Sequence, residues 1–393
     1  MHGAHGDLLA LLLLLAGSFF MPLVSGRLRV PSAVLLIGYG VVVGPHALHL
    51  VSDLGVVRFL NEVGFIVLMF LAGLEIDFNG VRRRGRRALL AVVGICVTVF
   101  VLAFLASGWL GLHPIYGLAV GATSVGLPLA VLKETGLLRT RLGQNVIVVG
   151  SVGEFFTVVG MTLFYFAVRY GLSLKLLVAM GKLVGMLALA GLTLRFLMAL
   201  AWWHPSRFSR LVDEHDASEV GVRASLLMMM VFSVLAVFAG LESVVGAFVA
   251  GALMAFVLRG KEVLEEKLSV VGHGLFVPIF FIVVGLRFDP HAVTGTTLAL
   301  AGKLLLATFA IRVAPSLVLH RFGLTLREAV ATASLLSAPL TLVVAISAIG
   351  LELGVLGHGG RGTLIVLAVL AGVVFPVAFR LVAPGRSGHP IPQ

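Results

Sequence analysis

The most regular feature of the chain is an alternation of long apolar runs with short segments that carry charge, glycine or proline. Thirteen runs could form helices, at residues 8–25, 32–49, 57–76, 88–108, 113–132, 142–168, 173–201, 222–239, 242–258, 270–286, 293–319, 328–349 and 362–383. A helix needs about 20 predominantly apolar residues to cross the hydrocarbon layer of a bilayer, and most runs approach that length. The pattern therefore predicts an all-α polytopic membrane protein with about 13 transmembrane helices.

Composition supports a membrane protein and excludes several classes of soluble protein. Hydrophobic residues make up 59% of the 393 residues and charged residues only 12%, which is more apolar surface than a soluble domain can bury. The net charge of +11 would suggest nucleic acid binding in a soluble protein. Here the basic residues fall between apolar runs, so we expect no nucleic acid partner. The single cysteine, Cys96, excludes a disulfide framework and a cysteine-based metal site.

The basic residues are distributed unequally between the two sets of connecting segments. Twenty Lys and Arg residues fall in the connectors after odd-numbered runs and at the C-terminus, whereas five fall on the opposite side. Because short connectors rich in Lys and Arg stay on the cytoplasmic side, we expect a multi-pass protein of the cell's inner (plasma) membrane. Its N-terminus is expected outside and its C-terminus in the cytoplasm.

Two runs, 113–132 and 328–349, carry hydroxyl residues and a proline near mid-span. The residues are Thr123, Ser124 and Pro128 in the first, and Ser337, Pro339 and Thr341 in the second. Proline removes a backbone donor and frees the carbonyl four residues earlier, and in lipid such groups are tolerated only where protein or water satisfies them. A corresponding pair of interrupted helices in two inverted halves indicates the midplane site of a secondary transporter. Ordinary proline-kinked helices would share the pattern.

Two ionisable residues lie near the middle of apolar runs, where a charge is costly and is by default a functional candidate. Glu154 stands alone in the run 142–168, and burial of a carboxylate there suits a site that trades a proton for a cation. Arg312 lies about 15 Å from the end of its helix, near the midplane. We expect Glu154 to be its counter-ion. A neutral, hydrogen-bonded Glu154 and a purely structural ion pair are the alternatives.

No other pattern in the sequence indicates catalysis. The histidines lie near run ends and loops, and no HExxH sequence or close group of His, Asp and Glu suggests a catalytic metal. The Gly-rich stretches lack a Walker or dinucleotide pattern, and no nucleophile–base set is present. We therefore expect a protein that is not an enzyme and uses no cofactor.

Five segments resemble motifs of one family, in the same order along the chain. They are 31–45, 64–77 with its FxxGLExD stretch, 122–125, 246–251 with GAFxAG, and 278–289 with PxFFxxxGLxxD. On these segments the chain resembles the bacterial monovalent cation/proton antiporters, the branch of sodium/proton exchangers and Kef-type potassium transporters. The resemblance implies a secondary transporter that exchanges Na⁺ or K⁺ for protons by alternating access.

The resemblance also implies roles for individual residues. The family carries an acidic pair where this chain has Gly153 and Glu154, so Glu154 takes the ion-binding carboxylate and the first side chain of the pair is missing. The lysine or arginine of the family matches Arg312. Because hard cations prefer oxygen ligands, the candidate co-ligands are Thr123, Ser124, Ser151, Ser337 and Thr341. A single carboxylate predicts electroneutral exchange.

The implied organisation is one membrane domain over residues 1–393, with inverted repeats, a moving core, a dimerising scaffold, and no soluble regulatory domain. The first core half spans 56–168 and includes the interrupted helix 113–132 and the carboxylate helix 142–168; the second spans 270–383 and includes the interrupted helix 328–349. We expect a homodimer. A Kef-like channel or efflux path and a non-transporting sensor or scaffold are the alternative functions, and the choice between Na⁺, K⁺ and Li⁺ stays open.

Overall fold

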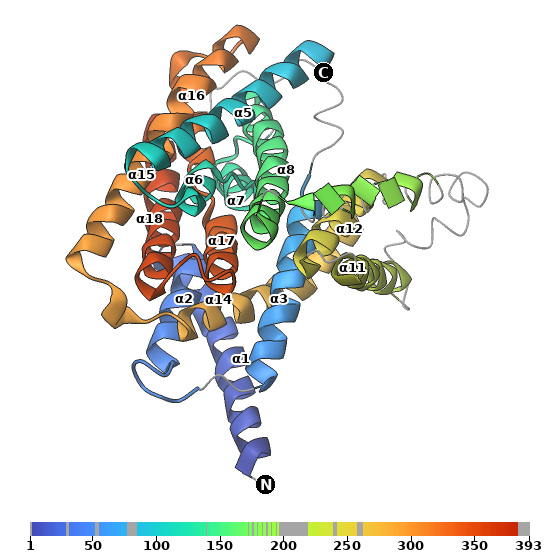
Figure 1. The fold of residues 1–393 in the computed structure, drawn as a ribbon, viewed down its shortest axis with the longest axis vertical. Coiled ribbons are helices and arrows are strands. Elements are labelled where there is room, and N and C mark those ends of the chain that lie inside the picture. The colour runs from blue at the N-terminus through green and yellow to red at the C-terminus, as the bar shows by residue number, and fades with distance from the viewer. Residues whose placement is uncertain are drawn as a thin grey trace. The chain divides into compact units, whose positions relative to one another are not determined.

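The computed structural model of the chain consists of helices grouped in two compact units. It describes residues 2–28, 31–51, 55–76, 85–138, 140–171, 219–238, 242–257 and 262–383, together with scattered positions between 173 and 195. Each unit combines two separate stretches of chain: Met1–Ile76 with Phe166–Phe288 in unit 1, and Asp77–Tyr165 with Asp289–Gln393 in unit 2. Figure 1 shows the helices of both units.

Unit 1 contains the N-terminal helices and a second group that follows in the middle of the chain. Its elements are α1 (His2–Leu28), α2 (Ser32–Val43), α3 (Gly55–Leu74), α11 (Val220–Phe238), α12 (Ser243–Val257), α13 (Glu262–Val271), the π-helical turn η1 (Gly272–Phe276) and α14 (Val277–Leu286). Within this unit α3 packs along α12, and α2 packs along α14 (Figure 1).

Glycines bring α2 and α14 into direct backbone contact. A Cβ atom on Gly40 of α2 would overlap the carbonyl oxygen of Ile282, and a Cβ atom on Gly285 of α14 would overlap the carbonyl oxygen of Ile37. Each glycine therefore lies against the residue three positions before the other glycine. Small residues permit this approach, which is common where helices associate inside membranes.

The contact between α3 and α12 repeats the same arrangement. A Cβ atom on Gly73 of α3 would overlap the carbonyl oxygen of Phe248, and one on Gly251 of α12 would overlap that of Phe70. Again each glycine lies against the residue three positions before its counterpart. Unit 1 thus contains two helix pairs held by reciprocal glycine contacts.

Unit 2 contains the candidate residues of the sequence analysis. Its elements are α5 (Gly85–Trp109), α6 (Pro114–Gly121), α7 (Gly126–Thr135), most of α8 (Arg141–Tyr170), the short turn η2 (Pro290–Ala292), α15 (Gly295–Ser316), the turn η3 (Leu317–Phe322), α16 (Leu326–Leu336), α17 (Leu340–Glu352) and α18 (His358–Val382).

Both helices that the sequence predicts to be interrupted are broken in unit 2. The first break, residues 122–125, separates α6 from α7, and Ala122 has a non-helical backbone with φ −56° and ψ 136°. The second break lies between α16 and α17, at residues 337–339. Pro128 and Pro339 have no N–H for the residue four positions earlier, which weakens a continuous helix at each place.

The predicted class, a helical membrane protein with many spans, is confirmed, whereas the predicted number of spans is not. Among the described residues, ten helices are long and apolar enough to cross a membrane, and two shorter apolar helices are Ser32–Val43 and Ser243–Phe256. The protein is therefore a helical polytopic membrane protein. The predicted run at 173–201 lies largely outside the described residues, so a total of thirteen spans stays a prediction.

Two helix boundaries differ from the apolar runs. The run 32–49 is helical only to Val43, because Gly44 has an extended backbone before Pro45, as the residue before a proline prefers. The run predicted from 270 begins as a helix at Glu262, since Leu264 and Leu268 are buried and extend one apolar face toward the N-terminus.

Candidate functional site

Glu154 lies at the first break of unit 2. Its side chain comes from α8 and is 1% exposed. Oε1 accepts a hydrogen bond from Ser124 Oγ at 3.1 Å, and Oε2 accepts one from the backbone N–H of Val125 at 3.3 Å. Because α7 begins at the next residue, Gly126, the carboxylate lies at the positive end of that helix dipole. This position stabilises a negative charge.

Arg312 reaches the other end of the same break. Its guanidinium comes from α15 and is 2% exposed. Nη1 donates to the carbonyls of Val120 at 2.8 Å and of Thr308 at 2.7 Å, and Nη2 donates to the carbonyl of Ala122. Val120 and Ala122 lie where α6 ends, so a positive charge satisfies carbonyls that have lost their helical donors and complements the negative end of the α6 dipole.

A threonine that the sequence analysis did not select holds the break against α8. The hydroxyl of Thr157 accepts a hydrogen bond from the backbone N–H of Thr123 at 3.0 Å and donates to the carbonyl of Gly153 at 2.8 Å. Thr157 is fully buried and lies three residues after Glu154, so both side chains are on one helix face. A polar residue at that spacing from an isolated carboxylate is the signal that could have identified it.

Gly153 leaves no room for a side chain. A Cβ atom there would lie 2.8 Å from Cβ and 2.9 Å from Cγ2 of Thr123. The side chain of Thr123 therefore fills the space beside the carboxylate that an acidic residue at position 153 would need. The structure gives a physical reason why this chain carries one acidic residue where the resemblance leads us to expect two.

The second broken helix reaches the site through a hydroxyl. Thr341, on the first turn of α17, has its Oγ1 3.2 Å from Ser124 Oγ. Ser337 behaves differently, because its hydroxyl donates to the carbonyl of Ala333 at 2.6 Å and lies 3.4 Å from that of Thr308. The structure thus brings Thr341 to the hydroxyl beside Glu154, whereas the hydrogen bonds of Ser337 stay with α16 and α15.

The remaining surroundings of the two breaks differ in polarity. Ser151, three residues before Glu154 on α8, is fully buried. Around the second break a buried apolar cluster includes Ala338, Ala371 and Phe375, against which Leu127, Leu305 and Phe309 pack. The carboxylate thus lies at the first break, and apolar side chains pack beside the second.

The arrangement can hold a small hard cation. A carboxylate, hydroxyls and backbone carbonyls are the ligands that such ions prefer. Among the residues that the structure describes, no group of three or more His, Cys, Asp or Glu side chains could hold a transition metal. The site therefore offers oxygen ligands of the kind that hard cations prefer.

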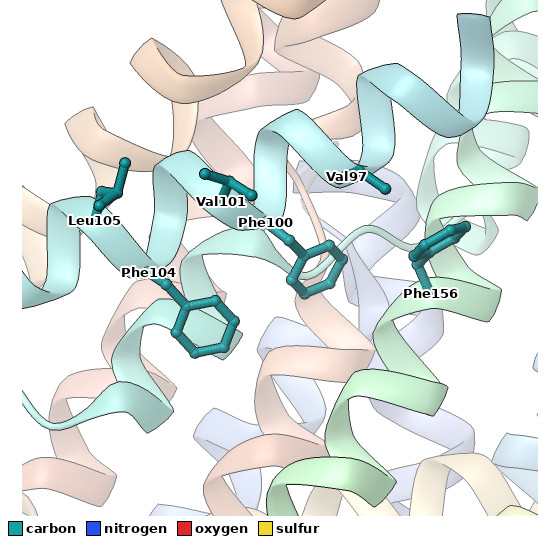
Figure 2. Close-up of a pocket in the computed structure, with 6 residues that line it drawn as sticks. All are labelled: Val97, Phe100, Val101, Phe104, Leu105 and Phe156. Carbon is teal, nitrogen blue, oxygen red and sulfur yellow. The ribbon is translucent and has the colours of Figure 1, made fainter. Parts of the chain in front are cut away.

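A separate groove lies on the surface of unit 2. It has a volume of about 480 Å³ and is lined by Val97, Phe100, Val101, Phe104 and Leu105 of α5 and Phe156 of α8. Figure 2 shows these side chains around the groove. The lining has no polar side chain, so the groove supplies no side-chain ligand for a cation.

The family comparison covers nearly the whole chain. A family model described as sodium/hydrogen exchanger, transmembrane, matches residues 13–383. The chain is similar to the putative Na⁺/H⁺ antiporter YjbQ of Bacillus subtilis (strain 168), with 29% identity over 96% of this chain; it spans 63% of the length of that protein. It is 23% identical to the probable Na⁺/H⁺ antiporter 3 of Methanocaldococcus jannaschii, over 92% of this chain and 93% of that one.

Two further similarities concern cation type and fold. The Na⁺/H⁺-K⁺ antiporter GerN of Bacillus cereus is 26% identical over 67% of each chain. The solved structure of the sodium proton antiporter MjNhaP1 from Methanocaldococcus jannaschii has a TM-score of 0.63 with 16% identity, over 97% of each chain. At that identity the structural likeness establishes the fold alone.

Proposed function

Because this chain belongs to the sodium/hydrogen exchanger family, we propose that Glu154 is the carboxylate through which it exchanges a monovalent cation for protons. As a member of that family the chain is a multi-pass membrane protein and a secondary active antiporter of Na⁺ (or K⁺) and H⁺, not an enzyme. The observation that carries the proposal is the position of Glu154, which is 1% exposed and faces a helix break.

The exchange follows from competition for one carboxylate. When Glu154 is charged, its two oxygens accept hydrogen bonds from Ser124 and Val125, and they carry the negative charge that attracts a cation. A proton on the same carboxylate removes that charge and releases the cation. Cation and proton therefore occupy Glu154 in turn, and carrying either one across the membrane by alternating access gives coupled exchange.

Several oxygens beside Glu154 can complete the coordination of the cation. Ser124 already contacts the carboxylate, Thr123 packs against Gly153 from the break, and Ser151 is buried three residues before Glu154 on α8. We infer that these three, with carbonyls of the break, replace water around the ion. Thr341 contributes from the second broken helix through its contact with Ser124. A ligand role for Ser337, whose hydroxyl donates to the carbonyl of Ala333, stays a prediction.

We assign Arg312 the role of fixing the first break and balancing its charge. Its guanidinium, which comes from α15, donates to the carbonyls at the end of α6. These bonds hold a positive charge on one side of the break, and Glu154 lies on the other. The direct pairing of Glu154 with Arg312 stays a prediction. Either arrangement places a compensating positive charge near an empty, charged carboxylate.

We further propose that exchange is electroneutral. One carboxylate can carry one proton or one monovalent cation, so a complete cycle moves no net charge. The packing of Thr123 against Gly153 supports this stoichiometry, since it leaves no space for a second acidic side chain at that position.

We also propose the organisation that the family resemblance implies, with inverted repeats, a moving core and a dimerising scaffold. The two reciprocal glycine contacts of unit 1, and the repeated GLxxD sequence at Gly73 and Gly285, support inverted repeats. We infer that the halves 56–168, which contains Glu154, and 270–383 form the moving core, and that the remaining helices form the scaffold of a homodimer. The basic connectors favour an external N-terminus and a cytoplasmic C-terminus in the plasma membrane.

Flux measurements in proteoliposomes test the function. Vesicles with an internal pH dye receive Na⁺, K⁺ or Li⁺ outside, and alkalinisation or acidification of the lumen reports exchange. The parent protein should move protons in response to at least one cation, whereas Glu154→Gln should not, although it elutes as the same oligomer. Glu266→Gln, an exposed carboxylate on α13, is the matched control and should exchange like the parent. Parent-like exchange by Glu154→Gln would refute the assignment.

A further inference from the structure

A row of three oxygens connects the carboxylate to the second broken helix. Glu154 Oε1 on α8 lies 3.1 Å from Ser124 Oγ in the first break, and Ser124 Oγ lies 3.2 Å from Thr341 Oγ1 on α17. Ser124 and Thr341 are 217 residues apart in the chain. The same hydroxyl of Ser124 therefore contacts both the proposed ion-binding group and a separate helix.

The number of protons in this row fixes the direction of its hydrogen bonds. A hydroxyl donates one hydrogen and accepts at two lone pairs, whereas a charged carboxylate only accepts. When Glu154 is charged and empty, Ser124 gives its hydrogen to Oε1. The hydrogen between the two hydroxyls must then come from Thr341, so that Thr341 donates to Ser124.

A cation at Glu154 reverses this order. A cation held by the carboxylate and by Ser124 occupies a lone pair of the hydroxyl oxygen, and its charge repels the hydroxyl hydrogen. The hydrogen of Ser124 turns away from the ion, and Thr341 Oγ1 is the acceptor that lies within reach. Ser124 then donates to Thr341, and the Thr341 hydrogen is directed elsewhere.

Resting on the proposed function, we propose that Thr341 is a positioning residue whose hydrogen bond with Ser124 changes direction when a cation binds the charged, empty Glu154. Through this bond the start of α17 responds to occupancy of a site on α8. The hydroxyl of Ser337 cannot take over, because it donates to the carbonyl of Ala333.

Other charged or titratable groups near the row are few among the described residues. Arg312 of α15 contacts the break at Val120 and Ala122, and Cys96 of α5 contacts the carbonyl of Val149 on α8. These contacts of both residues are to backbone carbonyls and not to the hydroxyl row. Glu154 is therefore the group whose change of state the hydroxyl row reports.

Thr341→Val tests the proposal because valine keeps the shape of threonine and removes the hydroxyl. In the cation-bound state Ser124 then has a buried donor with no acceptor at α17, whereas in the charged empty state it still donates to Glu154. Both states lose the bond between the two hydroxyls, but only the cation-bound state leaves a buried donor without an acceptor. This difference should raise the KM for the cation roughly two- to tenfold, with a smaller change in kcat. The pH of half-maximal exchange should move upward, since fewer protons then suffice to displace the cation.

Three further variants separate this role from a structural one. Thr341→Ser keeps the hydroxyl and should restore the parent KM. Thr332→Val is the matched control, because Thr332 is a fully buried threonine of α16 whose hydroxyl donates to the carbonyl of Glu328 in its own helix; its KM should equal that of the parent. In the Ser124→Ala background, Thr341→Val should add no further change in KM.

The outcomes distinguish this inference from the proposed function. If Glu154→Gln is inactive but Thr341→Val has the KM and pH profile of the parent, the inference is wrong and the function of Glu154 stands. Equal defects in Thr341→Val and Thr341→Ser, or additive effects of Ser124→Ala and Thr341→Val, would also overturn it. Protection of each variant against thermal unfolding by the cation in detergent gives an independent measure of affinity.

Discussion

Glu154 and Arg312 contact opposite ends of one helix break. The carboxylate accepts from the N–H of Val125 where α7 begins, and the guanidinium donates to the carbonyls of Val120 and Ala122 where α6 ends. At this break the C-terminal end of α6 is the negative end of its helix dipole, and the N-terminal end of α7 is the positive end of its own. Each end receives a side chain of the opposite charge, so the break is held by two other helices.

Replacing Arg312 with Gln should therefore affect both stability and pH dependence. The carbonyls at the end of α6 lose charged donors, which should lower the free energy of unfolding by roughly 2–4 kcal/mol. Removal of the positive charge makes a proton on Glu154 more favourable, so the pH of half-maximal exchange should move upward. Thermal melting in detergent and pH profiles of exchange in proteoliposomes measure the two effects.

Arg312→Lys separates charge from hydrogen bonding. Lysine keeps the positive charge but lacks the planar fork that reaches several carbonyls at once, so it should melt earlier than the parent while its pH profile stays close to that of the parent. An unmoved pH profile in Arg312→Gln would show that the charge of Arg312 does not act on Glu154.

Electroneutral exchange predicts that the membrane potential leaves the exchange ratio unchanged. Each uncompensated charge moved in a cycle would couple to the potential at about 2.3 kcal/mol per 100 mV. Setting the potential of the vesicles with valinomycin and K⁺ in a Na⁺ assay should therefore give the same steady-state ratio at every potential. A ratio that follows the imposed potential would contradict transport on a single carboxylate.

Substitutions at two glycines of α8 test the packing beside the site. Gly153→Ala should lower stability by about 1–3 kcal/mol and reduce exchange, because its Cβ would lie 2.8 Å from that of Thr123. Gly160→Ala is the matched control on the same helix, since its Cβ would have its nearest neighbour, Leu118 Cδ1, at an ordinary 3.4 Å. Because alanine has a better helix propensity than glycine, Gly160→Ala should be at least as stable as the parent protein. Equal melting temperatures for both variants would mean that Thr123 moves aside freely.

The sequence could predict where the site lies but not which atoms meet there. A proline beside hydroxyl residues in each of two apolar runs was sufficient to predict both breaks, because proline removes a helical donor at a fixed position. An isolated acidic residue in an apolar run was sufficient to select Glu154. Both signals depend only on residues that are neighbours in the chain, so one sequence is enough to find them.

The contacts themselves depend on tertiary structure. The sequence predicts Glu154 as the partner of Arg312, and that pairing stays a prediction. The carbonyls that Arg312 contacts at the end of α6 could not be predicted, because a backbone carbonyl is the same for every residue type. The approach of Ser124 to Thr341 is equally invisible, because it joins positions 217 residues apart. The role of Thr157 is hard to predict for a simpler reason, since a threonine in a helix usually bonds its own backbone.

The fit of Thr123 against Gly153 also constrains how this chain can evolve. A lineage that gained an acidic side chain at position 153 alone would meet the overlap with Thr123 before it gained any transport advantage. A lineage that first reduced Thr123 to a smaller residue would pass through a form with a loosened break beside Glu154. Under the proposed one-for-one exchange, a second acidic side chain at position 153 would thus need a change at position 123 as well.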